Sequence, residues 1–315
     1  MITELPVLPA HALPDCPAQR RWLIDGLWAD QAVGIVGGEP KCCKSFLALD
    51  MAVAVASGTP CLRRFPVPTA GRVLLFAAED ALHVVRERLA GICAAAGLDL
   101  QSLDLQVITA PSLRLDLEPD RRLLKATVER LSPRLLLLDP FVRLHRIDEN
   151  VSGEVAPLLA WLRDLQRAHQ LAVCLVHHAR KGAGRARAGQ ALRGSSEFHA
   201  WGDSNLYLRR SGESLSLSIE HRAAPSSNGL PLALLQNGPS LALALLDPQR
   251  PADPAPASAI ERVEKALSTL PTPVPLAALR DACRMRTQSV SAALGSLLQQ
   301  GRISRTSDGY ALRAP

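Results

Sequence analysis

Residues 32–45 read AVGIVGGEPKCCKS, and this stretch decides the fold of the chain. A short β-branched run at 32–36 enters a turn rich in glycine and proline, and Lys44 and Ser45 then open an apolar helix. A strand, a glycine-rich loop and a helix in this order are the setting of a phosphate-binding loop. In such a loop, backbone N–H groups at the helix N-terminus cradle the phosphates.

The loop predicts an ATP site with Mg²⁺ as its companion ion. Lys44 would reach the β- and γ-phosphates, and the Ser45 hydroxyl would bind Mg²⁺. The pattern G-x-x-x-x-G-K-[ST] has glycine where Cys43 stands, and a Cβ there crowds a backbone that passes close to phosphate. The alternative is a chance turn before a core helix. The nucleotide-binding residues that the pattern predicts are Gly38, Glu39, Pro40, Lys41, Cys42, Cys43, Lys44, Ser45 and Phe46.

Composition sets wider limits. The chain has 315 residues, 47% of them hydrophobic, so we expect about two domains with sizeable cores. No apolar run reaches the ~18 residues of a membrane span, and the N-terminus does not resemble a signal peptide. Seven scattered cysteines without C-x-x-C pairs argue against a disulfide framework or a zinc site. These features predict a cytoplasmic protein without membrane contact, and the net charge of +6 permits a polyanionic partner.

Apolar runs typical of buried strands alternate with helical segments as far as residue 210. This alternation predicts an α/β fold with a mostly parallel sheet covered on both faces. Short strands joined by polar turns then predict an antiparallel extension of the sheet. The predicted domains are a lead-in at 1–30, an ATPase domain at 31–246, a proline-rich linker at 247–257 and a small domain at 258–315.

Three polar residues follow apolar strands of the predicted sheet. Glu79, after the run RVLLFA, could orient and deprotonate the attacking water, or it could simply favour the positive end of the next helix. Asp139 ends the run RLLLLD and is expected to hold Mg²⁺. Pro140 follows it in place of an acid, so the base has to come from another strand. His178, after LAVCLV, could sense the γ-phosphate, or it could be a strand-end histidine with a structural partner.

The segment 177–196, HHARKGAGRARAGQALRGSS, holds five Lys or Arg residues, four glycines and no acid. It is either a mobile solvated loop or a nucleic-acid loop whose arginines contact phosphates. With aromatic residues at only 3% of the chain, base stacking is a weak expectation.

The order of these motifs resembles the RecA-like ATPases, and it is most similar to plasmid RepA-type hexameric replicative helicases and related bacterial AAA-annotated ATPases. The amino-acid sequences of the segments VLLFAAED, VHHARKG and ALRGSS also resemble those of that group. The resemblance covers about 31–210. It implies two DNA-contacting loops that face a central channel, at 141–153 and 179–193, and a homo-oligomer, a hexamer in those relatives. It also implies that Arg193 reaches the nucleotide of the neighbouring subunit, with Arg209 and Arg210 as second choices.

Residues 258–315 predict three helices followed by a hairpin at Asp308-Gly309, an order that resembles a winged helix. They contain eight Lys or Arg and four Asp or Glu, a net of +4. This charge favours duplex DNA binding with helix 287–300 in the major groove, and the alternative is a winged helix that contacts protein.

The sequence therefore predicts an ATP-hydrolysing DNA-binding protein, a ring-forming RepA-like replicative helicase or motor. Its catalytic residues would be Glu79, Lys44, His178 and Arg193, and Ser45 and Asp139 would hold the metal. A second interpretation is a nucleotide-gated DNA-binding regulator or loader that hydrolyses ATP slowly and does not unwind DNA. Cys43 in the phosphate loop slightly favours this second interpretation. A small-molecule kinase is disfavoured because the basic loop would have no role there.

Overall fold

The computed structural model describes residues 7–13, 15, 17, 21–178, 197–237, 240–246, 259–283, 285 and 287–312. The chain separates into two compact units, Met1–Leu246 and Asp247–Pro315. The apolar cores of the first unit and the core of the second are separate clusters. Within the described ranges, no helix combines the length and apolarity that crossing a bilayer requires.

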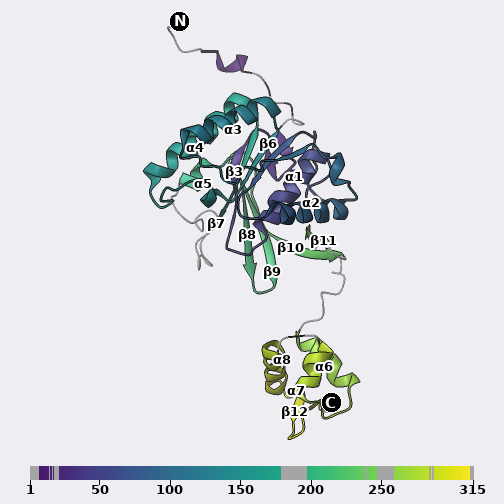
Figure 1. Ribbon diagram of the computed structural model, residues 1–315. Coiled ribbons are helices and arrows are strands. Elements are labelled where there is room, and N and C mark those ends of the chain that lie inside the picture. Colours follow the sequence, from purple (N-terminus) through teal and green to yellow (C-terminus); the bar gives the residue numbers. More distant parts are fainter. Residues whose placement is uncertain are drawn as a thin grey trace. The chain divides into compact units, whose positions relative to one another are not determined.

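The described part of the first unit is built on a nine-stranded sheet, ordered β11-β10-β9-β8-β3-β7-β6-β4-β5 (Figure 1). The strands from β8 to β5 are parallel, and β9, β10 and β11 extend the sheet beyond β8 in antiparallel pairs. The predicted parallel sheet with an antiparallel extension is confirmed. The strands span Val33–Gly38 (β3), Val73–Ala77 (β4), Leu105–Val107 (β5), Leu135–Asp139 (β6), Ala172–His178 (β7), Ser204–Ser211 (β8), Ser214–His221 (β9), Ser227–Asn237 (β10) and Ser240–Leu245 (β11).

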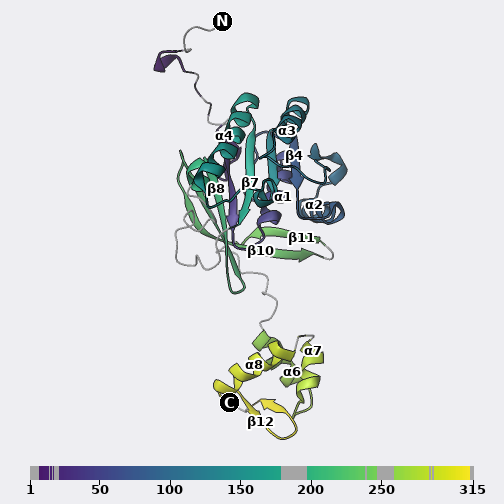
Figure 2. The same ribbon diagram turned by 60° about the vertical axis from the view of Figure 1, so that its left-hand side comes forward.

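Helices cover both faces of this sheet, α1 and α2 on one side and α3, α4 and α5 on the other (Figure 1, Figure 2). Parallel strands need this cover because both of their faces are apolar. The helices span Lys44–Ser57 (α1), Leu82–Ala96 (α2), Glu118–Leu131 (α3), Ser152–His169 (α4) and Glu197–Trp201 (α5), and short 3-10 turns span Ala10–Ala12 (η1), Leu100–Ser102 (η3) and Phe141–Arg143 (η4).

Strand β6 explains why the sequence of the parallel strands is apolar throughout. Leu135 and Leu137 contribute to the core on the side of α1 and α2, whereas Leu136 and Leu138 contribute to the core on the side of α3 and α4. Successive side chains of a strand point to opposite faces, so each core takes every second residue. The strand is therefore buried on both sides, and it delivers Asp139 to its carboxyl end.

Strand β3 lies between β7 and β8 at a distance that only glycine allows. A Cβ on Gly34 would lie 1.7 Å from the carbonyl oxygen of Ser204 and 3.0 Å from the ring of Trp28. Trp28 is fully buried and belongs to a hairpin that precedes the sheet. Part of the predicted lead-in at 1–30 thus packs into the core of the first unit. The strands of this hairpin span Trp22–Ile24 (β1) and Trp28–Ala29 (β2).

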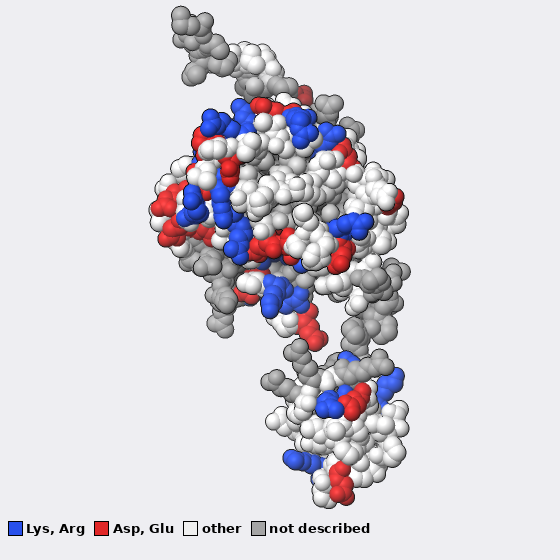
Figure 3. Space-filling view, viewed as in Figure 1, with Lys and Arg blue, Asp and Glu red and all other residues white. Residues whose placement is uncertain are grey.

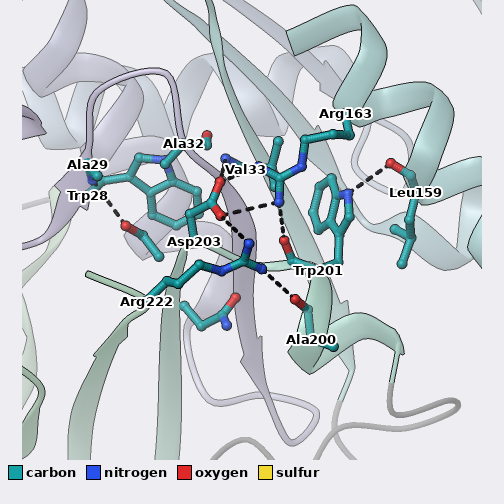
Figure 4. Close-up of polar contacts among 12 residues, drawn as sticks. Trp28, Ala29, Ala32, Val33, Leu159, Arg163, Ala200, Trp201, Asp203 and Arg222 are labelled. Carbon is teal, nitrogen blue, oxygen red and sulfur yellow. Dashed lines mark hydrogen bonds and ion pairs between the residues drawn. The ribbon is translucent and has the colours of Figure 1, made fainter. Parts of the chain in front are cut away.

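The amino end of β8 is anchored by one carboxylate, Asp203 (Figure 4). It accepts hydrogen bonds from the backbone N–H of Val33 at 3.3 Å and from both terminal nitrogens of Arg163. Arg222 completes the network as an ion pair at 3.4 Å. The indole of Trp201 donates to a backbone carbonyl of α4 at 2.8 Å. These contacts hold α4, α5, β3 and β8 together at the end of the sheet opposite the phosphate loop.

The described part of the second unit contains three helices and a two-stranded antiparallel sheet. Its core is an apolar cluster to which Val263, Leu279, Val290 and Leu297 contribute fully buried side chains. The order of helices and hairpin agrees with the elements that the sequence predicts, and the winged-helix assignment stays a prediction. The elements span Ala259–Thr269 (α6), Leu276–Cys283 (α7), Thr287–Gln299 (α8), Ile303–Arg305 (β12) and Tyr310–Leu312 (β13).

Candidate nucleotide-binding site

The loop between β3 and α1 passes closer to its neighbours than a side chain would permit. Gly38 has a φ of +155°, and a Cβ on it would lie 2.4 Å from the carbonyl oxygen of Leu208. At the other end of the loop, Cys43 precedes α1 with φ 65° and ψ 25°, a left-handed conformation. For a residue with a Cβ this conformation costs ~1–2 kcal/mol. The crowding that the sequence predicts at Cys43 therefore comes with backbone strain.

Lys44 is 5% exposed at the start of α1. Its Nζ donates a hydrogen bond to the backbone carbonyl of Glu39 at 2.8 Å and lies 3.9 Å from Sγ of Cys42. Burial lowers the pKa of Lys44, and the charges of nearby acidic groups, among them Asp139, act in the opposite direction. The ammonium group is thus held beneath the loop, at the place where phosphate oxygens would lie.

Three carboxylates converge beside Lys44. Asp139 ends β6, which pairs in parallel with β4, and Glu79 and Asp80 follow β4. Asp139 is 8% exposed, and burial raises its pKa from 3.8 to about 6. A hydrogen bond from Ser45 and the charge of Lys44 lower the pKa of Asp139, whereas the charges of the other two acids raise it. The site therefore sets one buried carboxylate between a lysine and a hydroxyl.

These side chains line one cavity of about 400 Å³. A volume of this order is typical of small-molecule sites. Of the predicted nucleotide-binding residues, Gly38, Glu39 and Pro40 lie in the same loop but do not line the cavity. The lining residues are Lys41, Cys42, Cys43, Lys44, Ser45, Phe46, Glu79, Asp80, Arg88, Asp139, Pro140, Val176 and His178.

The donor set fits ATP with Mg²⁺. Among the described residues, no group of three or more His, Cys, Asp and Glu side chains could hold a metal ion by itself. Mg²⁺ is usually bound by one or two protein ligands together with phosphates and water, and Ser45 and Asp139 offer that number. Lys44 offers the positive charge that the β- and γ-phosphates need.

The two histidines at the end of β7 have different surroundings. His178 lines the cavity from the end of β7. His177 is 1% exposed and its ring stacks on Phe198 with centroids 4.3 Å apart. Its Nδ1 lies 3.9 Å from a carboxylate oxygen of Glu149, and the same oxygen lies 3.3 Å from Nε2 of His145. His177 thus connects β7 with the segment that follows β6.

Arg88 lines the cavity from α2, although the sequence does not mark it as a site residue. It forms an ion pair with Asp80, and its guanidinium carbon lies 5.3 Å from the centre of the Phe46 ring. No motif marks an arginine on an amphipathic helix.

Of the three candidates for an arginine that acts on a neighbouring subunit, Arg193 lies outside the described residues. Arg209 and Arg210 are exposed at the end of β8. Arg210 donates from Nε to the backbone carbonyl of Lys41 at 3.3 Å and from Nη2 to Sγ of Cys43 at 3.4 Å. Its side chain therefore contacts the phosphate loop of its own chain.

A family model described as "AAA domain" matches residues 2–184. The chain belongs to this AAA-domain family. Its structure is similar to one described as "ATPase Domain of G40P", with a TM-score of 0.53 and 14% identity over 68% of this chain and 86% of that chain. It is also similar to the structure of a DnaB-like replicative helicase and its interactions with primase. There the TM-score is 0.52 and the identity 13%, over 68% of this chain and 57% of that chain.

These matches confirm the resemblance that the motifs predict. The AAA-domain protein has a P-loop ATPase core with the RecA-like fold that it shares with these two structures. At identities of 13% and 14% the likeness to the two structures concerns the fold. The roles of individual site residues rest on the geometry described above.

Asp139→Asn is expected to stabilise the nucleotide-free protein at pH 8, because it removes a buried charge and keeps an acceptor for Ser45. A pKa of about 6 in place of 3.8 means that the folded state binds this proton more readily than the unfolded state, so ionisation destabilises the fold. The gain should be about 3 kcal/mol at pH 8, roughly half of that at pH 5 and absent below about pH 3. Urea unfolding followed by circular dichroism measures it, and an equal gain at pH 8 and pH 5 would contradict the assignment.

Cys43→Gly is expected to raise the affinity for ATP or the turnover rate, because it removes a Cβ from a left-handed residue in the loop. The relief of ~1–2 kcal/mol is partly offset by the ~0.5–1 kcal/mol that glycine costs through the unfolded chain, so stability should change little. Titration with a fluorescent ATP analogue and steady-state turnover are the measurements. Cys43→Ala is the matched control, since it removes the thiol but keeps the Cβ. Wild-type values in Cys43→Gly would mean that the loop has adapted to cysteine.

Proposed function

We propose that the chain is a DNA-stimulated ATPase that works as a ring-forming motor of the replicative-helicase type, similar to the plasmid RepA group. The observation that supports this best is the convergence of Lys44, Ser45, Glu79 and Asp139 on one cavity beside the segment that follows β6. The two similar structures, named as a DnaB-like replicative helicase and the G40P ATPase domain, support the same function class.

Five residues of the cavity have an assigned task in this proposal. Bound ATP with Mg²⁺ supplies a phosphoanhydride whose charge the ion partly neutralises. Lys44 holds the phosphates, and Ser45 with Asp139 holds the ion. Glu79 accepts a proton from the attacking water, since Pro140 leaves no acid directly after Asp139. His178 donates a hydrogen bond toward the γ-phosphate and couples its presence to the basic segment that follows β7.

The DNA contacts are proposed at two loops, 141–153 and 179–193. On the face seen in Figure 3, Lys and Arg side chains are interspersed with Asp and Glu on both units. On this face, contacts to phosphates would therefore come from local groups rather than from a broad basic surface. The loop at 179–193 holds five Lys or Arg residues and no acid, and its residues lie outside the described ranges.

A ring is proposed because the RepA-type resemblance places an arginine against the nucleotide of the next subunit. Such a residue neutralises charge that develops during phosphoryl transfer and can contribute ~10³-fold or more to the rate. Arg193 is the first choice. The contact of Arg210 with its own phosphate loop makes that residue a weaker candidate for action on a neighbour.

The second candidate function is a nucleotide-gated DNA-binding regulator or loader that hydrolyses ATP slowly and unwinds nothing. The left-handed conformation of Cys43 favours it, because strain in the phosphate loop slows turnover more readily than it prevents binding. Fast, DNA-stimulated hydrolysis would favour the motor. DNA retention that depends on ATP, without unwinding, would favour the regulator.

The ATPase proposal predicts a split between two variants. Lys44→Ala should abolish ATP binding or turnover, whereas Glu79→Gln should still bind ATP and lose ~10²–10⁴-fold in turnover, the usual effect of removing a general base. Turnover with and without single-stranded DNA, nucleotide binding and the mass in solution are measured together. Wild-type turnover in Glu79→Gln would move the base to another residue. A monomeric mass with ATP and DNA present would remove the ring.

The second unit is proposed to bind duplex DNA as a winged helix, on the basis of its element order and its net charge of +4. Deletion of 248–315 should then weaken duplex binding and leave the ATPase stimulated by single strands largely intact. Replacing Arg185 and Arg187 with Ala should do the reverse, and should lower the salt slope of single-strand binding by up to about 0.7 per lost phosphate contact. If the truncated protein binds duplex as tightly as the full chain does, the second unit is a module for protein contacts.

A further inference from the structure

Glu79 lies between two cavities. It lines the nucleotide cavity, and it also lines a neighbouring recess of about 490 Å³. On the recess side, Nε of Arg143 donates a hydrogen bond to Oε1 of Glu79 at 2.9 Å. The residue proposed as the general base is thus paired with a cation that is not part of the nucleotide cavity.

The backbone that carries Arg143 is fixed although its guanidinium is not. Phe141 and Leu144, on either side of it, are fully buried. The guanidinium of Arg114 donates to the backbone carbonyls of Arg143 and His145, which fastens the turn to the segment after β5. The side chain of Arg143 remains 60% exposed. A ligand in solution can therefore reach the guanidinium without unfolding the turn.

The recess has the charge of an anion site. Its described lining contains two guanidinium groups, Arg114 and Arg143, and one carboxylate, Glu79. Glu79 is already paired with Arg143, one of the two guanidinium groups. A second anion that enters the recess therefore competes with Glu79 for Arg143. A phosphodiester suits the two guanidiniums, because arginine binds phosphate oxygens in paired hydrogen bonds.

We propose that Arg143 restrains the base Glu79, and that a phosphodiester of single-stranded DNA releases it by taking Arg143 into the recess. This inference rests on the proposed function. While Oε1 of Glu79 accepts this hydrogen bond, the carboxylate is held toward the recess and is not free to turn to the attacking water. Once Arg143 turns to the phosphodiester, Glu79 faces the attacking water. Arg143 is thus a positioning residue that makes hydrolysis depend on DNA.

The first test measures turnover in the absence of DNA. Arg143→Gln should raise the DNA-free turnover number about two- to fivefold, the shift that an exposed arginine–carboxylate pair can exert on a two-state equilibrium, with the Michaelis constant for ATP unchanged. Stimulation by a thymidine oligonucleotide should fall by the same factor. Arg143→Lys keeps the charge and should therefore raise the DNA-free rate less than Arg143→Gln does.

Arg122→Gln is the matched control for that experiment. Arg122 is an exposed arginine that pairs with Glu118 at 3.9 Å on α3, away from both cavities. Its loss changes the net charge by the same amount and removes a comparable ion pair. The DNA-free rate of this variant should equal that of the wild type, and a rise as large as that of Arg143→Gln would overturn the proposal.

The second test uses DNA binding without hydrolysis. Because coupling between two sites is reciprocal, a base that competes with DNA for Arg143 must weaken DNA binding. Without nucleotide, Glu79→Gln should therefore bind the fluorescently labelled oligonucleotide about two- to fivefold more tightly than the wild type. In the Arg143→Gln background the same substitution should give no gain. An equal gain in both backgrounds would reflect general charge repulsion and would overturn the proposal.

The two tests separate this inference from the function on which it rests. A faster DNA-free rate in Arg143→Gln, in a protein that neither binds single-stranded DNA nor is stimulated by it, supports the restraint and removes DNA as the releasing ligand. Wild-type stimulation by DNA with an unchanged DNA-free rate in Arg143→Gln keeps the motor and overturns the restraint.

Discussion

The rest of the structure depends on how closely the backbone of β3 lies between β7 and β8. Gly34 and Gly38 make this approach possible, since a Cβ on either residue would lie 2.4 Å or less from a carbonyl oxygen of β8. In this position β3 joins the parallel half of the sheet to its antiparallel extension. It also brings the phosphate loop to the same edge as the carboxyl ends of β4, β6 and β7. Because all of these ends meet at one edge, residues far apart in the chain form a single cavity.

The segment after β6 contacts two different parts of the catalytic edge. Arg143 pairs with Glu79 beyond β4, and Glu149 lies within 3.9 Å of His177 on β7. The buried Phe141 and Leu144 hold the segment between these contacts. A displacement of this segment would therefore change the contacts of Glu79 and of His177, on either side of Asp139. In the proposed function, this segment would connect DNA bound outside the cavity with the groups inside it.

Much of this could be predicted from local pattern. The apolar runs were recognisable as strands because each one serves two cores, and Glu79, Asp139 and His178 were recognisable because they follow such runs. The pair of Arg143 and Glu79 could not be predicted, because it joins two exposed side chains 64 residues apart and no periodicity links them. Arg88 was missed because no motif marks an arginine within a helix that borders the site. The left-handed conformation of Cys43 could be predicted only in part. The motif expects glycine at this position, but it does not give the sign of φ.

Cys43 also distinguishes this phosphate loop chemically. Its partly exposed side chain lines the nucleotide cavity, at a position where the general motif has a residue with no side chain at all. A nucleotide analogue that carries a mild electrophile near its terminal phosphate would meet a thiol in this protein and none in P-loop proteins that follow the motif. The substitution that strains the loop therefore also makes it open to selective covalent labelling, in a class of proteins whose phosphate sites are otherwise hard to tell apart.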